Sequence, residues 1–256
     1  FNNFDTVFVK NTPSKYSLIL RNSNWLNFYN FDMDNKNKIV MQSELYYNAG
    51  FILGYKFLLL GYSVNLNETF SGQTVKSQEL DLHVNCSCLG IDVYYTDNQG
   101  ATSITEFKGI KNIKNKGVSF DGLTMRTLDG DINYYFNNKK YANSAAYSRG
   151  YFKQQKKSAG SFIAGLSYAR HRIYFDFTNL PEDTMYSSLK TLDDKSILYN
   201  SYCLNFGYGY NLVFSKKWLA NLTVIPSAGF NSYKKKMSED IPNNKISMNT
   251  KVKAAL

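Results

Sequence analysis

The chain has 256 residues and a formal net charge of +10, and 16% of its residues are aromatic, including 21 Tyr. No run of about 18 apolar residues occurs, which excludes a transmembrane helix. Cys86 and Cys88 lie too close in the chain for a relaxed disulfide, and no Cys or His spacing predicts a metal site.

Apolar and polar side chains alternate along most of the chain, which predicts strands because successive side chains of a strand point to opposite faces. Residues 1–14 show no such pattern and are expected to form an N-terminal strap. Strands are predicted over residues 15–31, 46–57, 58–67, 79–88, 91–95, 128–137, 161–169, 201–214, 218–230 and 246–256. Because the last of these alternates to its final residue, we expect that C-terminal strands are missing.

The connections between the strands are of two kinds. The join near Phe57 predicts a tight hairpin. The polar stretches 97–120 and 177–198 predict two long loops, which in an outer-membrane barrel face the cell exterior. Residues 144–155 fit either a strand or a short helix.

The longest alternation is SYCLNFGYGYNLVF, residues 201–214, with large side chains such as Phe206 at even positions and small or polar ones such as Asn205 at odd positions. It exceeds the ~9–11 residues with which a tilted strand crosses a bilayer. The many tyrosines suit a membrane interface. Since only a closed barrel satisfies every backbone group in lipid without helices, residues 15–256 are predicted to form an all-β, transmembrane antiparallel barrel of about 10–12 strands.

Charged residues fall on the strand faces opposite the apolar ones, where a barrel in a membrane has its lumen. The residues predicted to form a structural polar network in the lumen are Glu79, Asp81, His83, Asp92, Asp129, Asp131, Lys251 and Lys253. Arg21 and Lys56 are further opposing charges on this face. The alternative is a soluble lipocalin-like barrel, which would turn its apolar face inward.

Basic residues in the predicted loops and at one strand end are expected to contact anionic lipid. They are Lys108, Lys111, Lys114, Lys116, Arg170 and Arg172. At the bacterial outer membrane they would meet the phosphates of lipid and lipopolysaccharide, so no nucleic acid partner is expected; the alternative is that they are merely solvated. His171, between two arginines, is expected to meet lipid phosphates or solvent.

A cluster of short motifs lies in residues 134–168. The motifs are Phe136-Asn137, Lys140-Tyr141, Ala145-Ala146, and Gln155 with Lys157-Ser158-Ala159-Gly160-Ser161. This pattern resembles an uncharacterised family of outer-membrane β-barrel proteins from the Bacteroidota, a domain of unknown function. Arg149 stands where the family pattern suggests an amide. The resemblance implies an outer-membrane barrel and no particular activity.

No catalytic residue, metal or cofactor is predicted. His83 with nearby acids and Ser87 leaves a lipid-modifying outer-membrane enzyme as an alternative, because a Ser–His–acid group can create a nucleophile. The expected function is that of a non-enzymatic barrel in the bacterial outer membrane. It would be either a narrow pore or a structural or accessory subunit of a complex with other outer-membrane proteins.

Overall fold

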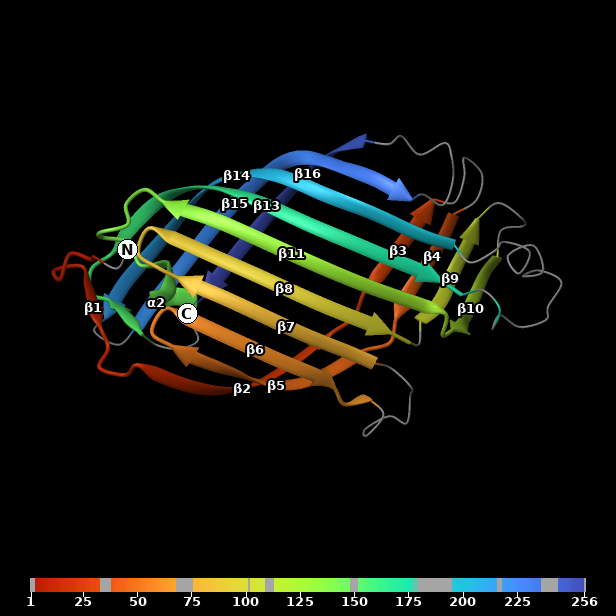
Figure 1. Ribbon diagram of the computed structural model, residues 1–256, viewed down its shortest axis with the longest axis horizontal. Coiled ribbons are helices and arrows are strands. Elements are labelled where there is room, and N and C mark those ends of the chain that lie inside the picture. The colour runs from red at the N-terminus through yellow and green to blue at the C-terminus, as the bar shows by residue number, and fades with distance from the viewer. Residues whose placement is uncertain are drawn as a thin grey trace.

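The computed structural model describes residues 3–32, 38–67, 76–100, 102–108, 113–147, 152–176, 178, 195–215, 218–235 and 244–255. Within these residues the protein is all-β, with three antiparallel sheets and a short helix, α2 (Asn143–Tyr147). No helix in the described residues is long and apolar enough to span a membrane. The largest sheet wraps around an interior that runs along its strands (Figure 1).

This wrapped sheet has ten strands, and hydrogen bonds join each strand to an antiparallel neighbour. In spatial order they are β16 (Asn244–Ala255), β15 (Trp218–Lys235), β14 (Lys195–Ser215), β13 (Ala159–Phe175), β11 (Leu123–Tyr135), β8 (Leu89–Gln99), β7 (Lys76–Asn85), β6 (Leu58–Asn65), β5 (Tyr46–Tyr55) and β2 (Tyr16–Trp25). In the described part of the chain, no backbone pairing joins β2 to β16. The antiparallel β architecture is therefore as predicted, whereas closure into a barrel is not observed.

The chain passes back and forth between two ends of the wrapped sheet. The turn end carries the hairpin turn at Lys56 and Phe57, as predicted, and the turn over residues 86–88. The loop end carries the connections that follow β6, β8, β13 and β15. In the register, Gln99 pairs with Thr124 and Phe175 pairs with Leu123, so the predicted loops 97–120 and 177–198 start at the same end. Residues 177 and 179–194 lie outside the described residues.

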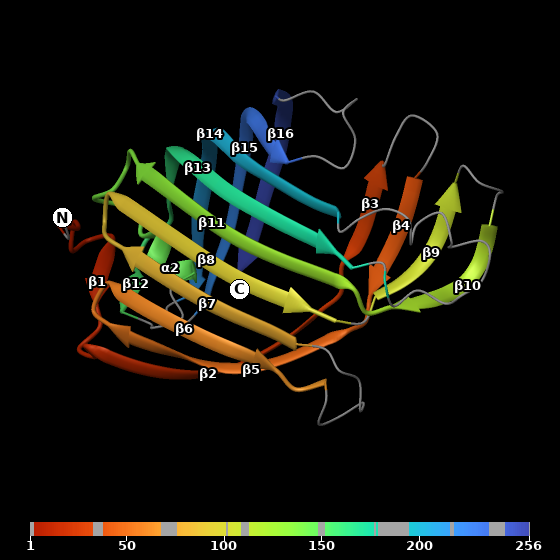
Figure 2. The same cartoon turned by 45° about the vertical axis from the view of Figure 1, so that its right-hand side comes forward.

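Residues 97–120 are not the long loop that their polar composition predicts. β8 extends to Gln99, and β9 (Thr102–Lys108) and β10 (Ile113–Phe120) form a hairpin. With β4 (Lys38–Ser43) and β3 (Phe28–Asp32) they form a second sheet, in the order β10-β9-β4-β3, beyond the loop end (Figure 2). The prediction was wrong because the few apolar residues of this stretch, such as Ile104 and Phe120, are buried against β4.

At the turn end, a long connection joins β11 to its neighbour β13 where a short turn would suffice. This connection, residues 136–158, contains α2 and β12 (Lys153–Gln155), so the ambiguous stretch 144–155 holds a helix and then a strand. β12 pairs with β1 (Val9–Asn11), which belongs to the predicted N-terminal strap. Figure 1 shows β1 and α2 at the same end of the wrapped sheet.

Most large apolar side chains of the wrapped sheet lie on its outer face, and most polar side chains lie on its inner face. On β14, Phe206 is 64% exposed, whereas the neighbouring Asn205 is 1% exposed. Further large apolar side chains exposed on the outer face are Leu20, Phe51, Leu60, Leu80, Ile132, Phe162, Leu222 and Met248. This sidedness is the opposite of the arrangement that the soluble lipocalin-like alternative requires.

Candidate functional site

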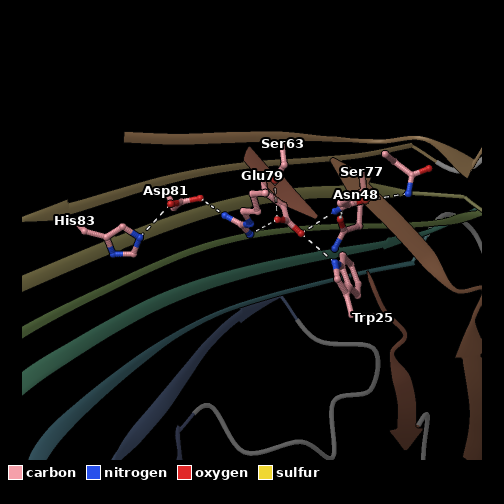
Figure 3. Close-up of polar contacts among 10 residues, drawn as sticks. Trp25, Asn48, Ser63, Ser77, Glu79, Asp81 and His83 are labelled. Atoms are coloured by element: carbon pink, nitrogen blue, oxygen red, sulfur yellow. Dashed lines mark hydrogen bonds and ion pairs between the residues drawn. The ribbon is translucent and has the colours of Figure 1, made fainter. Parts of the chain in front are cut away.

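A chain of charged side chains occupies the middle of the interior (Figure 3). Arg21 on β2 donates to Glu79 Oε2 and to Asp81 Oδ1 on β7, each at 2.5 Å. Two strands, β5 and β6, separate β2 from β7, so a flat sheet would hold their backbones about 14 Å apart. The side chains meet because the sheet curves strongly around them.

Two glycines on the inner face permit this curvature, because they place no side chain where the strands approach each other closely. Gly50 pairs with Arg21, and a Cβ placed on it would lie 2.1 Å from the carbonyl oxygen of Tyr62. Gly61 pairs with Asp81, and its added Cβ would lie 2.3 Å from Asp81 Oδ2. Any larger residue at either position would collide with the wall or with the carboxylate that Arg21 binds.

The Glu79 carboxylate is saturated by four donors from three strands. Besides Arg21, it accepts hydrogen bonds from Trp25 Nε1 at 3.0 Å, Asn48 Nδ2 at 2.8 Å and Ser63 Oγ at 2.9 Å. A buried carboxylate is stable only when it is paired and hydrogen-bonded in this way. Glu79 therefore has the geometry of a structural residue that ties β2, β5 and β6 to β7.

His83 lies between two carboxylates. Its Nδ1 is 2.7 Å from Asp92 Oδ1, and its Nε2 is 3.0 Å from Asp81 Oδ2. Only a doubly protonated imidazole donates from both nitrogens. Neither nitrogen is left to take a proton from Ser87, which lies in the turn between β7 and β8.

Two ion pairs cross the interior from β16. Lys251 Nζ lies 2.5 Å from Asp131 Oδ2 on β11, and Lys253 Nζ lies 3.9 Å from Asp92 Oδ2 on β8. Asp92 and Asp131 are directly paired in the β8–β11 ladder, where two like charges destabilise a sheet. The lysines of β16 compensate this repulsion from the opposite wall.

The structure brings most of the predicted lumen residues into this one network. Asp129 lies on the same inward face, paired in register with Tyr94. The sequence did not single out Trp25, Asn48 and Ser63 as ligands of Glu79. The only signal was their place on the polar strand faces, because alternation does not reveal which residues of other strands, here one to three strands away, lie beside Glu79.

The connection 136–158, here called the plug, is fastened to the inner wall by Gln155. The Oε1 atom of this buried side chain accepts from the backbone of Ala142 and from Asn211 Nδ2 on β14, each at 3.0 Å. Its Nε2 donates to the carbonyls of Lys140 at 2.7 Å and Lys157 at 2.8 Å. One amide thus holds both halves of the plug together and joins them to the sheet.

Apolar contacts attach the plug to opposite walls. Tyr141 is fully buried with Ile163 of β13 and Ile225 of β15, whereas Phe152 packs on Ile52 of β5 and Leu59 of β6. The plug therefore extends across the interior at the turn end. On β14, a Cβ added to Gly209 would lie 2.5 Å from Tyr141 Oη, so the plug packs closely against this strand.

The loop end is filled by apolar side chains from both sheets. Ile39, Met41 and Ile104 of the second sheet pack in one buried cluster with Ile173 and Phe175 on the inner face of β13. The interior thus has an apolar layer at the loop end, a charged layer in the middle and the plug at the turn end.

The predicted lipid-contacting residues are spread over two regions. Arg170 and Arg172 are exposed on the outer face of β13. Lys108 lies in β9, and Lys114 and Lys116 lie in β10; their side chains and the whole of Lys111 are outside the described structure. His171 was predicted wrongly: it faces inward and stacks on Tyr199 with ring centroids 4.7 Å apart, because alternation turns it away from its arginine neighbours.

The described side chains contain no group of three or more His, Cys, Asp or Glu residues that could hold a metal ion. A family model described as a domain of unknown function (DUF4421) matches residues 3–256. No curated protein and no solved structure matches the chain.

Proposed function

The chain belongs to the DUF4421 family, and we propose that it is a non-enzymatic β-barrel of the bacterial outer membrane with an occluded interior. It serves as a structural or accessory subunit of a larger outer-membrane complex. The observation that carries this proposal is the sidedness of the wrapped sheet, which is apolar outside and charged inside.

The outer face supports a lipid environment. A water-exposed surface of this kind would be a strong aggregation hazard, since soluble monomers rarely expose large contiguous apolar patches. Aromatic pairs such as Phe214 and Trp218, stacked 6.4 Å apart at the turn end, fit a membrane-interface girdle. The resemblance of residues 134–168 to outer-membrane proteins of the Bacteroidota supports the same location.

Lipid allows no open sheet edge, because unpaired backbone groups there cost several kcal/mol each. The proposal therefore requires that the edges of β2 and β16 be paired in the membrane. The ion pairs from β16 to β8 and β11 favour a closed form, since they already hold the two walls of the interior together.

The three layers of the interior favour an occluded barrel over the narrow pore that the sequence also allowed. Between the charged layer and the plug lies a cavity of about 370 Å³, lined by Arg21, His83 and Lys253 on one side and by Asn143 and Ala146 of α2 on the other. The plug ends this cavity on the turn side. These layers of described residues therefore favour an interior without a continuous path for ions.

The lipid-modifying enzyme remains the alternative function, and the geometry of His83 does not favour it. A nucleophilic serine needs an imidazole nitrogen that can accept its proton. Both nitrogens of His83 face carboxylates.

Planar-bilayer recording tests the proposal. We expect the wild-type protein to insert without steady conductance, and we expect the same of a variant with residues 138–157 replaced by a short Gly-Ser turn, because the charged layer and the apolar layer at the loop end would still fill the interior. Insertion is checked separately by flotation of protein-loaded vesicles on a density gradient. Steady single-channel steps from the wild type would contradict occlusion and establish the pore.

A further inference from the structure

At the turn end, three lysines converge on one cleft. The cleft has a volume of about 230 Å³, and its lining includes Lys15 before β2, Lys56 in the β5–β6 turn and Lys153 of β12. No carboxylate is among the lining residues. Besides the lysines, Phe57 and Phe152, the lining provides amide and hydroxyl groups, for example from Asn11, Ser14 and Asn85. Such a lining is complementary to a compact anion.

The backbone of Lys56 is an independent sign that its side chain is needed there. Lys56 has a φ of 54°, and it is the only described residue other than glycine with positive φ. This conformation favours glycine or asparagine and strains a lysine. Strain that persists at one residue is a reason to look for a function of its side chain.

The two flanking lysines are held in position. The backbone N–H of Lys56 donates to the carbonyl of Lys15 at 2.8 Å, which fixes the strap against the hairpin turn. Lys153 Nζ donates to Asn11 Oδ1 and lies 4.8 Å from the ring centroid of Phe4. A lysine ammonium has three donors, so Lys153 retains hydrogen-bonding capacity for an anion.

An apolar groove on the outer wall adjoins the cleft. It has a volume of about 530 Å³ and is lined by exposed side chains of β2, β5 and β6, including Leu18, Leu53 and Leu60. Tyr16 and Tyr55 line it at the turn end, and Lys56 Nζ lies 5.1 Å from the ring centroid of Tyr55. The groove and the cleft therefore share the hairpin turn as their border.

We propose that this composite site binds one anionic phospholipid, with its phosphate in the lysine cleft and an acyl chain in the apolar groove. The acyl-chain part rests on the proposed membrane location. Charge complementarity selects the headgroup, because the three ammonium groups attract a lipid with net negative charge more strongly than a zwitterionic one.

Electron paramagnetic resonance with spin-labelled lipids in nanodiscs tests the site. We expect the wild-type protein to retain spin-labelled phosphatidylglycerol in preference to phosphatidylcholine. The variant Lys15→Gln/Lys56→Gln/Lys153→Gln should lose this preference by roughly tenfold or more, since it removes all three ammonium groups that attract the anionic headgroup. The matched control Lys10→Gln/Lys139→Gln/Lys157→Gln removes equal charge from the same end, outside the cleft, and should keep the preference.

The variant Lys56→Gly separates binding from folding, because it should raise thermal stability while lowering the lipid preference. An equal loss in both triple variants, or no loss in the cleft variant, would overturn the proposal. If the protein in neutral detergent binds inorganic phosphate as tightly as it binds phosphatidylglycerol, the cleft is a site for soluble phosphate. That result would overturn the proposal that a phospholipid is the ligand. Failure of the wild type to enter nanodiscs would overturn the membrane location as well, whereas entry without a lipid preference would overturn the lipid site alone.

Discussion

Lys251 and Asp131 form an ion pair with an Nζ–Oδ2 distance of 2.5 Å, although three strands separate β16 from β11 in the sheet. In a flat sheet these strands would lie about 19 Å apart. The contact therefore crosses the interior and not the sheet surface, and it shows how narrow the interior is at the charged layer.

Removal of this ion pair should reveal the repulsion that it compensates. Lys251→Met leaves Asp131 beside Asp92, and we expect a loss of about 1 kcal/mol in the free energy of unfolding, because Lys251 is partly exposed. Urea titration in detergent micelles measures this change. The double variant Lys251→Met/Asp131→Asn should recover part of the loss, and strictly additive effects would contradict the ion pair.

A larger loss is expected from Arg21→Met. This change leaves Glu79 buried without its cation and leaves Asp81 with His83 alone, and breaking a buried pair in this way costs about 3–5 kcal/mol. The same urea titration measures it. Arg170→Met, on the outer face, removes an arginine without leaving a buried acid, so a comparable loss in that control would show that Arg21 has no special role.

Lys56→Gly should stabilise the protein. Glycine adopts the positive φ of Lys56 without the steric cost of a Cβ, so we expect a gain of up to about 1 kcal/mol. The thermal transition of the folded form, followed by its electrophoretic mobility, measures the gain. Phe57→Gly, at the neighbouring turn residue without positive φ, should not stabilise; a lower transition for Lys56→Gly would contradict backbone strain.

Gly209→Ala should displace the plug. The new methyl group would meet Tyr141 Oη at 2.5 Å and Thr223 Oγ1 at 2.8 Å, and such overpacking costs about 1–3 kcal/mol. Protease cleavage within residues 136–158 should become faster. Gly130→Ala is the matched control, because its nearest neighbour is the carbonyl oxygen of Tyr168 at 4.0 Å; equal cleavage rates in both variants would contradict the packing of Tyr141 against β14.

Alternation was sufficient to predict the presence of the long strands and the faces of residues well inside them, as Phe206 and Asn205 show. It did not show that β13 extends to Phe175, and His171 was therefore predicted wrongly. It failed where a few apolar residues form a small sheet, as in β9 and β10, because burial there depends on β4, far away in the chain. The sequence predicted which residues form the charged layer, but it did not predict which of them contact each other. The pairing of Arg21 with Asp81 depends on curvature, which Gly50 and Gly61 permit and which local periodicity does not reveal.

The folding free energy of Phe206→Arg in lipid vesicles tests directly whether the outer face of the wrapped sheet contacts lipid, as we propose. Phe206 is 64% exposed on the outer face of β14. Near the middle of a bilayer an arginine at this position should destabilise the protein by about 2–4 kcal/mol. If the outer face contacts water, the same exposed residue should accept arginine with a change within about 0.5 kcal/mol, and that result would contradict contact of this face with lipid.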